Sequence, residues 1–156
     1  MDKRSVYVAL ITRLREEFDA TVGAQQDAAD YATNEEARAE SKYDTQGLEA
    51  SYLAAGQAAH ARELASALER LLGLETALTA PCHAAQQGAL VKCQQERFAD
   101  WFYLAPVGGG EVLQIDDNEV TVITLHSPIG EALKGKTAGA QFALPNGNSA
   151  NLAEVL

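Results

Sequence analysis

The first third of the chain repeats apolar residues every four positions, which is the spacing of one face of an α-helix. The series is Val6, Leu10, Leu14, Phe18 and Val22. Residues at this spacing lie on one helix face, and Asp2 precedes them as a candidate N-cap. Beyond Gly23 the same face continues only through alanines, so we expect a helix that ends near Tyr31 and has a thin outer half.

A second apolar segment has the reverse order of large and small residues. Its late part carries Leu64, Leu68, Leu71 and Leu72, whereas its early part carries Leu48, Tyr52, Leu53 and several alanines. An antiparallel pair would place the large residues of both helices together and the alanines together. The pattern therefore predicts a helical hairpin, and about 30 residues per helix give it a length of roughly 45 Å.

The pattern changes after Leu78, where Thr79, Ala80 and Pro81 end the helical spacing. Alternating apolar residues and turn signals then predict strands at 89–95, 99–105, 111–115, 119–125, 141–144 and 151–155. Ser127 and Pro128 mark the start of a short helix at 129–134. We expect an α+β protein with a hairpin at 1–78, its tip near 32–46, a linker at 79–87, and a small antiparallel sheet with one short helix at 88–156.

Charge is concentrated between the two predicted helices. Residues 27–49 hold seven acids and two bases, a net charge of −5 out of −10 for the whole chain. An acidic tip could deliver carboxylates to a metal ion or to a basic site on a partner. From the charge pattern alone, the more common role of such a run is to keep a long helix pair soluble. Asp44 or Thr45 is also placed to cap the second helix.

Composition limits the classes of function. A net charge of −10 and a pI near 4.6 argue against direct binding to nucleic acid, because the phosphate backbone attracts basic surfaces. Cys82 and Cys93 have no Cys or His at zinc-ligand spacing, so we expect two thiols in a reducing compartment. No apolar run approaches the length of a membrane span. The chain is therefore expected to be cytoplasmic and without a membrane segment.

Several motifs of the C-terminal part resemble one family. They are Tyr103–Pro106, the glycines 108–110, the run Ser127–Lys136 with the pattern SPxGxALxGK, and Gly139. In this order after a helical hairpin, they are similar to the Gre family of transcript cleavage factors. The resemblance implies an FKBP-like C-terminal domain that docks on the rim of the secondary channel of RNA polymerase. It also implies that the hairpin enters the channel, where two tip acids help to hold Mg²⁺ at the polymerase active site and stimulate cleavage of backtracked transcripts.

The resemblance also suggests site residues. The docking residues would be Ser127, Pro128, Ile129, Gly130, Leu133 and Lys136. At the tip, Asp44 matches the family's aspartate, but Gly47 stands where a glutamate is expected. The second acid is then Glu40 or Glu49, and the sequence does not assign it. The chain would be an accessory factor and not an enzyme, with no cofactor of its own and with Mg²⁺ contacted only in the complex.

Three alternatives remain open at this point. The chain could occupy the secondary channel and regulate transcription without cleavage, because its tip departs from the family pattern. The FKBP-like fold could instead carry peptidyl-prolyl isomerase activity, although a fold alone does not imply a function. The third alternative is a coiled-coil adaptor with no role at the polymerase.

Overall fold

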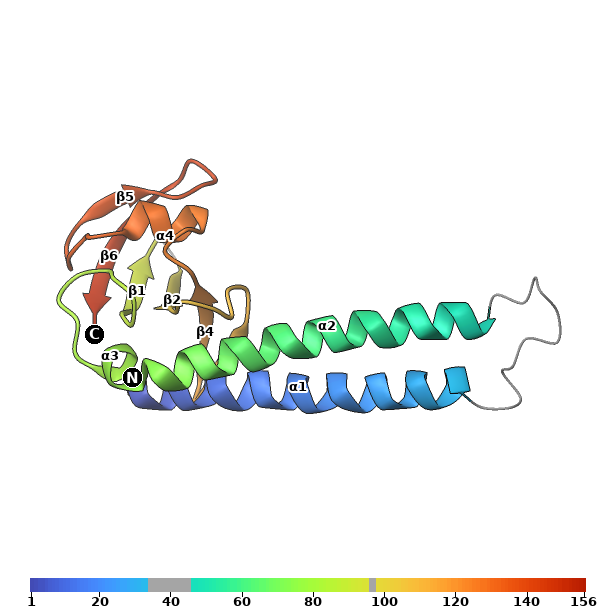
Figure 1. Cartoon of the computed structure of the whole chain (residues 1–156). Coiled ribbons are helices and arrows are strands. Elements are labelled where there is room, and N and C mark those ends of the chain that lie inside the picture. Colours follow the sequence, from blue (N-terminus) through green and yellow to red (C-terminus); the bar gives the residue numbers. More distant parts are fainter. Residues whose placement is uncertain (34–45, 96–97) are drawn as a thin grey trace. The chain divides into compact units, whose positions relative to one another are not determined.

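Two long helices open the fold and pack as an antiparallel pair. The computed structural model describes residues 1–33, 46–95 and 98–156. Helix α1 spans Lys3–Thr33 and α2 spans Gln46–Gly73, as predicted (Figure 1). The helical pattern expected to continue to Leu78 is interrupted at Leu74, after which α3 (Glu75–Thr79) forms a separate short helix. The Tyr7 hydroxyl donates to the Leu71 carbonyl, and Glu17 lies 3.0 Å from His60. Both contacts join an early residue of α1 to a late residue of α2.

The buried face of α1 differs from the predicted stripe at its outer end. Its buried residues include Lys3, Tyr7, Leu10, Leu14 and Thr21, which follow the alternating steps of three and four of a coiled coil. Val22, which was predicted on this face, is 41% exposed. Four residues advance about 40° beyond one full turn of an α-helix. From Val6 to Val22 this excess adds up over four steps, so Val22 lies outside the seam and Thr21 lies in it.

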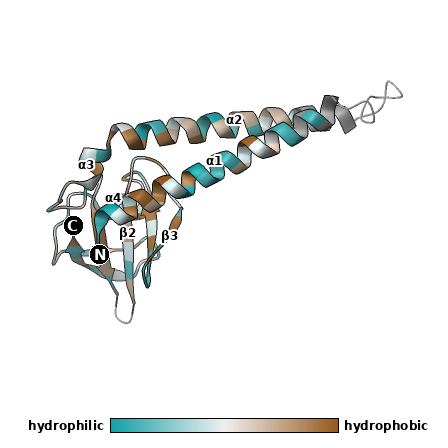
Figure 2. Ribbon diagram, turned by 90° about the horizontal axis from the view of Figure 1, so that it is seen from below, coloured by the Kyte–Doolittle hydropathy of each residue, from teal (hydrophilic) through white to brown (hydrophobic). Residues whose placement is uncertain are grey.

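Helix α2 keeps a similar spacing. Ala61, Leu64 and Leu71 are buried, whereas Leu72, which was predicted with the apolar end, is 48% exposed. Tyr52 and Leu53 are 71% and 56% exposed. Figure 2 shows the resulting alternation of hydrophobic and hydrophilic residues along both helices.

The chain divides into two compact units that cut across the helices. The sheet unit comprises Met1–Thr12 and Glu69–Leu156, and the hairpin unit comprises Arg13–Leu68. The sheet unit thus includes the first turns of α1 and the end of α2. The domain limits at 78 and 87 that the sequence suggested remain predictions about chain order.

A six-stranded sheet forms most of the sheet unit. The strands are β1 (Leu90–Gln94), β2 (Ala99–Leu104), β3 (Val112–Ile115), β4 (Asn118–Ile123), β5 (Gln141–Ala143) and β6 (Ser149–Val155), in the order β3-β4-β2-β1-β6-β5. After β2 the chain passes to the edge as β3 and returns as β4 beside β2. This path makes β2 and β4 parallel, while every other pair is antiparallel. The predicted α+β class, a helical hairpin followed by a small sheet, is confirmed, with this one parallel pair as the difference.

One face of the sheet carries a core that includes the short helix α4 (Pro128–Leu133). Phe102, Leu104, Ile123 and Leu152 are among its buried strand residues, and Leu133 enters it from α4. Trp101 and Tyr103 alternate with these residues along β2, so they lie on the opposite face. The Tyr103 hydroxyl donates to the Leu78 carbonyl at 3.0 Å, which ties that face to the end of α3.

Candidate functional site

The start of α4 is capped as the sequence predicted. The Ser127 hydroxyl accepts a hydrogen bond from the Gly130 amide at 3.1 Å and donates to the Thr124 carbonyl at 2.7 Å. Pro128 follows at the first helical position, where its missing amide hydrogen costs nothing. Pro128 is exposed, so the cap presents it to solvent.

Two of the predicted docking residues fix the position of α4. A Cβ on Gly130 would lie 1.9 Å from the Thr124 carbonyl oxygen, so this approach requires glycine. Leu133 is fully buried in the core. Lys136 is half-buried, and its backbone carbonyl accepts from the Ala85 amide at 2.7 Å. Gly130 and Leu133 act through backbone geometry and packing, whereas the exposed Pro128 and the half-buried Ile129 and Lys136 can meet a partner.

A groove of about 270 Å³ lies beside α4. It is lined by Cys93, Gln95, Asp100, Phe102, Ile129, Leu144, Pro145 and Asn146. The sequence predicted Ile129 as a docking residue but missed the others. Asn146 and Gly147 lie in the turn that joins β5 to β6. Only the strand order, with β6 next to β1, brings that hairpin near the first residues of β2.

The groove has an apolar floor and an acidic rim. Gln95 donates to the exposed Asp100 carboxylate at 3.2 Å. Phe98 is 70% exposed and lies directly before β2, two positions from Asp100. Exposed aromatic residues and apolar grooves are both typical of protein-binding surfaces. The arrangement fits an apolar side chain accompanied by a basic group.

The thiol that lines this groove is held in its neutral form. Burial raises the pKa of Cys93 to about 12, and the nearby Asp100 carboxylate acts in the same direction. The thiol therefore contributes an apolar surface to the groove and not a nucleophile.

The tip carboxylates can be placed only in part. Glu40 and Asp44 lie outside the described residues. Glu49 is exposed in the first turn of α2, where its charge suits the helix dipole. Within the described ranges, no group of three or more His, Cys, Asp or Glu residues could hold a metal ion. No helix of the described chain is long and apolar enough to cross a membrane.

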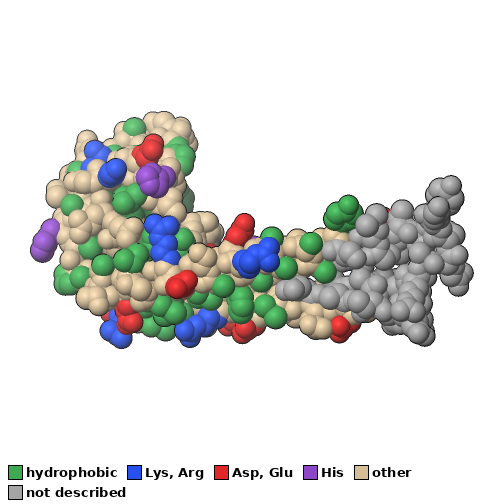
Figure 3. All heavy atoms as spheres, in the orientation of Figure 1, with side chains coloured by type: hydrophobic (Ala, Val, Ile, Leu, Met, Phe, Trp, Pro, Cys, Tyr) green, Lys and Arg blue, Asp and Glu red, His purple; other side chains and the backbone are tan. Residues whose placement is uncertain are grey.

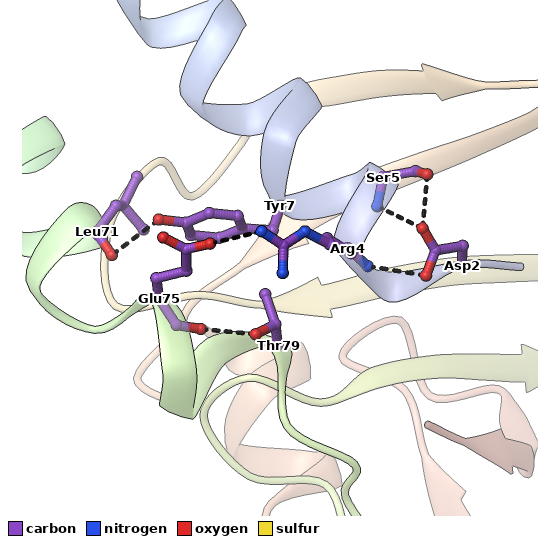
Figure 4. Close-up of polar contacts among 7 residues, drawn as sticks. All are labelled: Asp2, Arg4, Ser5, Tyr7, Leu71, Glu75 and Thr79. Carbon is purple, nitrogen blue, oxygen red and sulfur yellow. Dashed lines mark hydrogen bonds and ion pairs between the residues drawn. The ribbon is translucent and has the colours of Figure 1, made fainter.

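A polar network organises the first turn of α1 within the sheet unit (Figure 4). The Asp2 carboxylate accepts from the Arg4 and Ser5 amides at 3.2 and 3.0 Å, which confirms the predicted cap. The Ser5 hydroxyl and these amides hold the pKa of Asp2 below its usual value. Arg4 pairs with Glu75 of α3 at 3.0 Å. Helix α1 therefore begins at a position fixed by side chains of its own first turn and of α3.

Charged side chains of both signs are interspersed with apolar ones over the face of the sheet unit seen in Figure 3. The part of the hairpin unit farther along both helices from the sheet unit's residues differs. From residue 19 to 33 and from 46 to 59, the charged residues are Asp19, Asp27, Asp30 and Glu49, all acidic. Neither range contains a lysine or arginine, so these parts of the two helices are acidic in sequence.

Comparison with solved structures finds GreA factor homolog 1 (Gfh1) of Thermus thermophilus at 20% identity, covering 95% of both chains with a TM-score of 0.39. Gfh1 of Thermus aquaticus matches at 19% identity, covering 94% of both chains with a TM-score of 0.37. A structure described as the transcription factor Gfh1 matches at 22% identity, covering 94% of this chain and 93% of the other, with a TM-score of 0.40. No protein-family model and no curated protein matches this chain significantly.

Proposed function

We propose that this protein is an accessory factor of transcription elongation that binds RNA polymerase. The observation that carries the proposal is the run Ser127–Lys136, whose resemblance to the Gre docking segment coincides with a capped helix beside an apolar groove. The helical hairpin that precedes the sheet adds support, because the same order of parts belongs to the resemblance. Binding through a protein surface also suits a net charge of −10, which disfavours direct contact with nucleic acid.

In this proposal the two units have separate tasks. The surface around Pro128 and Ile129 docks on the rim of the secondary channel. The hairpin enters the channel, and its acidic end meets the basic groups and the Mg²⁺ of the polymerase. Carboxylate oxygens are the ligands that Mg²⁺ prefers, so Asp44, with Glu40 or Glu49, would supply them to a metal that the polymerase holds. The factor itself performs no chemistry and assists hydrolysis by the polymerase.

Docking can be tested by measuring binding to purified RNA polymerase. Phe98→Ala and Ile129→Ala should each weaken binding about 10-fold, because exposed aromatic and apolar anchors dominate protein interfaces. Val112→Ala is the matched control, since Val112 is 52% exposed on β3, at the other edge of the sheet. Equal binding by all four proteins, with unchanged thermal midpoints, would contradict docking at this groove, and no binding by the wild type would refute the proposed function.

Cleavage can be tested separately on stalled elongation complexes. Asp44→Ala should have the largest effect, and Glu40→Ala and Glu49→Ala should identify the second acid. If the wild type binds but cleavage does not accelerate, the protein is a secondary-channel regulator without cleavage activity. Loss of stimulation in a variant that still binds would assign the carboxylates to the reaction.

Peptidyl-prolyl isomerase activity is a second candidate, favoured by the apolar groove with Phe102 in its wall. A groove of this size can hold a proline ring beside an aromatic side chain. An isomerisation assay on Xaa-Pro peptides tests it, with Phe102→Leu as the variant that should lose activity. Absence of acceleration by the wild type would exclude the enzyme, and failure to retain polymerase in a pull-down would leave the coiled-coil adaptor.

A further inference from the structure

Lys3 is a buried lysine in the first turn of α1. Its side chain is only 7% exposed, although a cation at a helix N-terminus opposes the helix dipole. The ammonium donates to the Ala80 carbonyl, to the Leu156 carbonyl at 3.0 Å, and to the Cys82 sulfur at 3.5 Å. Lys3 thus joins α1, the segment after α3 and the last residue of the chain, all within the sheet unit.

Cys82 contacts the Lys3 ammonium and is surrounded by other polar groups. Its side chain is 5% exposed, and its sulfur accepts from Lys3 and, at 3.7 Å, from the Gln86 amide. Its own hydrogen can point to the Ala80 carbonyl at 3.5 Å. The amine nitrogen and the sulfur are therefore in contact, with room for little else between them.

The surrounding bonds keep the two groups together. On the α1 side, Asp2 caps the helix and Arg4 pairs with Glu75, so the turn that carries Lys3 is fixed on both sides (Figure 4). On the other side, the Tyr103 hydroxyl holds the Leu78 carbonyl shortly before Cys82. The contact is therefore a consequence of the fold and not of one free side chain.

We propose that Lys3 and Cys82 form an oxidative modification site, in which dioxygen links the lysine nitrogen to the cysteine sulfur through one oxygen atom. The ammonium, the thiol and one dioxygen give the N–O–S bridge, one water and one proton. One N–O and one O–S bond form, while the S–H bond, two net N–H bonds and the O–O bond break. Dioxygen accepts four electrons, and reduction by a thiol reverses the link.

The bridge would act as a covalent latch in the sheet unit. It joins residues 3 and 82 and so closes a loop that contains α1, α2 and α3. Closing a long loop lowers the entropy of the unfolded chain and raises stability. Oxidation would then lock the first turn of α1 to the segment after α3. This inference is independent of the polymerase and would hold for a protein with any function.

Cys93 provides an internal control, because it is equally buried but lies beside Asp100 and not beside an amine. The test is intact mass spectrometry of the full chain after exposure to dioxygen or after anaerobic storage. We expect a product that has gained one oxygen and lost two hydrogens, in the wild type and in Cys93→Ser. Lys3→Arg keeps the positive charge but should give none of it, and neither should Cys82→Ser.

Mapping of the wild-type protein keeps the test valid if a variant misfolds. After trypsin digestion, the peptide with Lys3 should remain joined to the peptide with Cys82, and dithiothreitol should separate them. The thermal midpoint should rise on oxidation and fall back with dithiothreitol. A product that gains only oxygen atoms, a bridge that persists in Lys3→Arg, or the absence of any joined peptide would overturn the proposal.

Discussion

The sheet unit and the hairpin unit bury their side chains in different ways. In the sheet unit, fully buried residues such as Leu71, Leu104 and Leu133 come from α2, β2 and α4. In the hairpin unit only two helices are available, and the buried residues include small or polar ones such as Ala61 and Thr21. A residue enclosed by several elements cannot be replaced without moving them, whereas a seam between two helices can adjust.

Because of this difference, we expect the sheet unit to tolerate few substitutions and the hairpin unit to tolerate more. The groove beside α4 depends on side chains that come from four elements or their flanking turns, and Cys93, Phe102 and Leu144 among them belong to the core. The helices of the hairpin unit need only keep a narrow seam, so their outward faces are free to carry charge. Substitutions of the same kind should therefore differ in effect between the two units.

Glycine-to-alanine substitutions should give the largest difference in stability change between the two units. Gly130→Ala would force a Cβ to 1.9 Å from the Thr124 carbonyl oxygen and should destabilise the protein by about 3 kcal/mol or more. Gly56→Ala in α2 meets nothing within 4 Å and should stabilise it by about 0.5–1 kcal/mol. Urea unfolding measures both. Destabilisation by Gly56→Ala, or an unchanged stability in Gly130→Ala, would contradict this difference between the units.

Leucine truncations give the next largest effect. Leu71→Ala in the sheet unit should cost about 3–5 kcal/mol, because Leu71 is 0% exposed and the cavity cannot collapse. Leu64→Ala in the hairpin unit, where the residue is 6% exposed, should cost about 2 kcal/mol. Leu72→Ala, at 48% exposure, is the matched control and should change stability by less than about 0.5 kcal/mol. Equal costs for Leu71 and Leu64 would show that the seam is as rigid as the core.

Much of the fold was predictable because it depends on local patterns. Each predicted strand is found within one or two residues of its expected limits, and Ser127 begins α4 as expected. The parallel pairing of β2 and β4 was not predictable, since it depends on how the chain returns from the sheet edge. The exchange of Val22 for Thr21 in the seam arises from accumulated helical rotation, which a rule of four neglects.

The candidate site was likewise predictable only where its residues are neighbours in the chain. The run from Ser127 to Lys136 could be found from sequence because its cap, its glycine and its buried leucine are neighbours in the chain. The groove could not, because Cys93, Asp100 and Leu144 meet only through the sheet order. The assignment of Glu40 and Asp44 stays a prediction, because they lie outside the described residues.

Alkaline pH should weaken the protein through the sheet unit. Burial raises the pKa of Cys93 from 9.0 to about 12 and also raises the pKa of Tyr103. Above pH 9 the unfolded chain loses the thiol proton that the folded chain keeps, so stability falls as pH rises. The contribution from Cys93 should be at most about 1.4 kcal/mol at pH 10, one unit above the thiol's ordinary pKa. Urea midpoints at pH 8 and pH 10 measure it, and an unchanged pH dependence in Cys93→Ala would contradict the assignment.

Exposed ion pairs should give the smallest effect and should not distinguish the units. Glu17–His60 in the hairpin unit, which is an ion pair only when His60 is protonated, and Arg4–Glu75 in the sheet unit both have separations of 3.0 Å. Their side chains are partly exposed to water. Solvent screening leaves such pairs worth about 0.5 kcal/mol or less, and alanine's helix propensity offsets part of the loss. His60→Ala and Arg4→Ala should therefore shift the thermal midpoint little and equally. A large loss for Arg4→Ala alone would mean that this pair belongs to the rigid packing of the sheet unit.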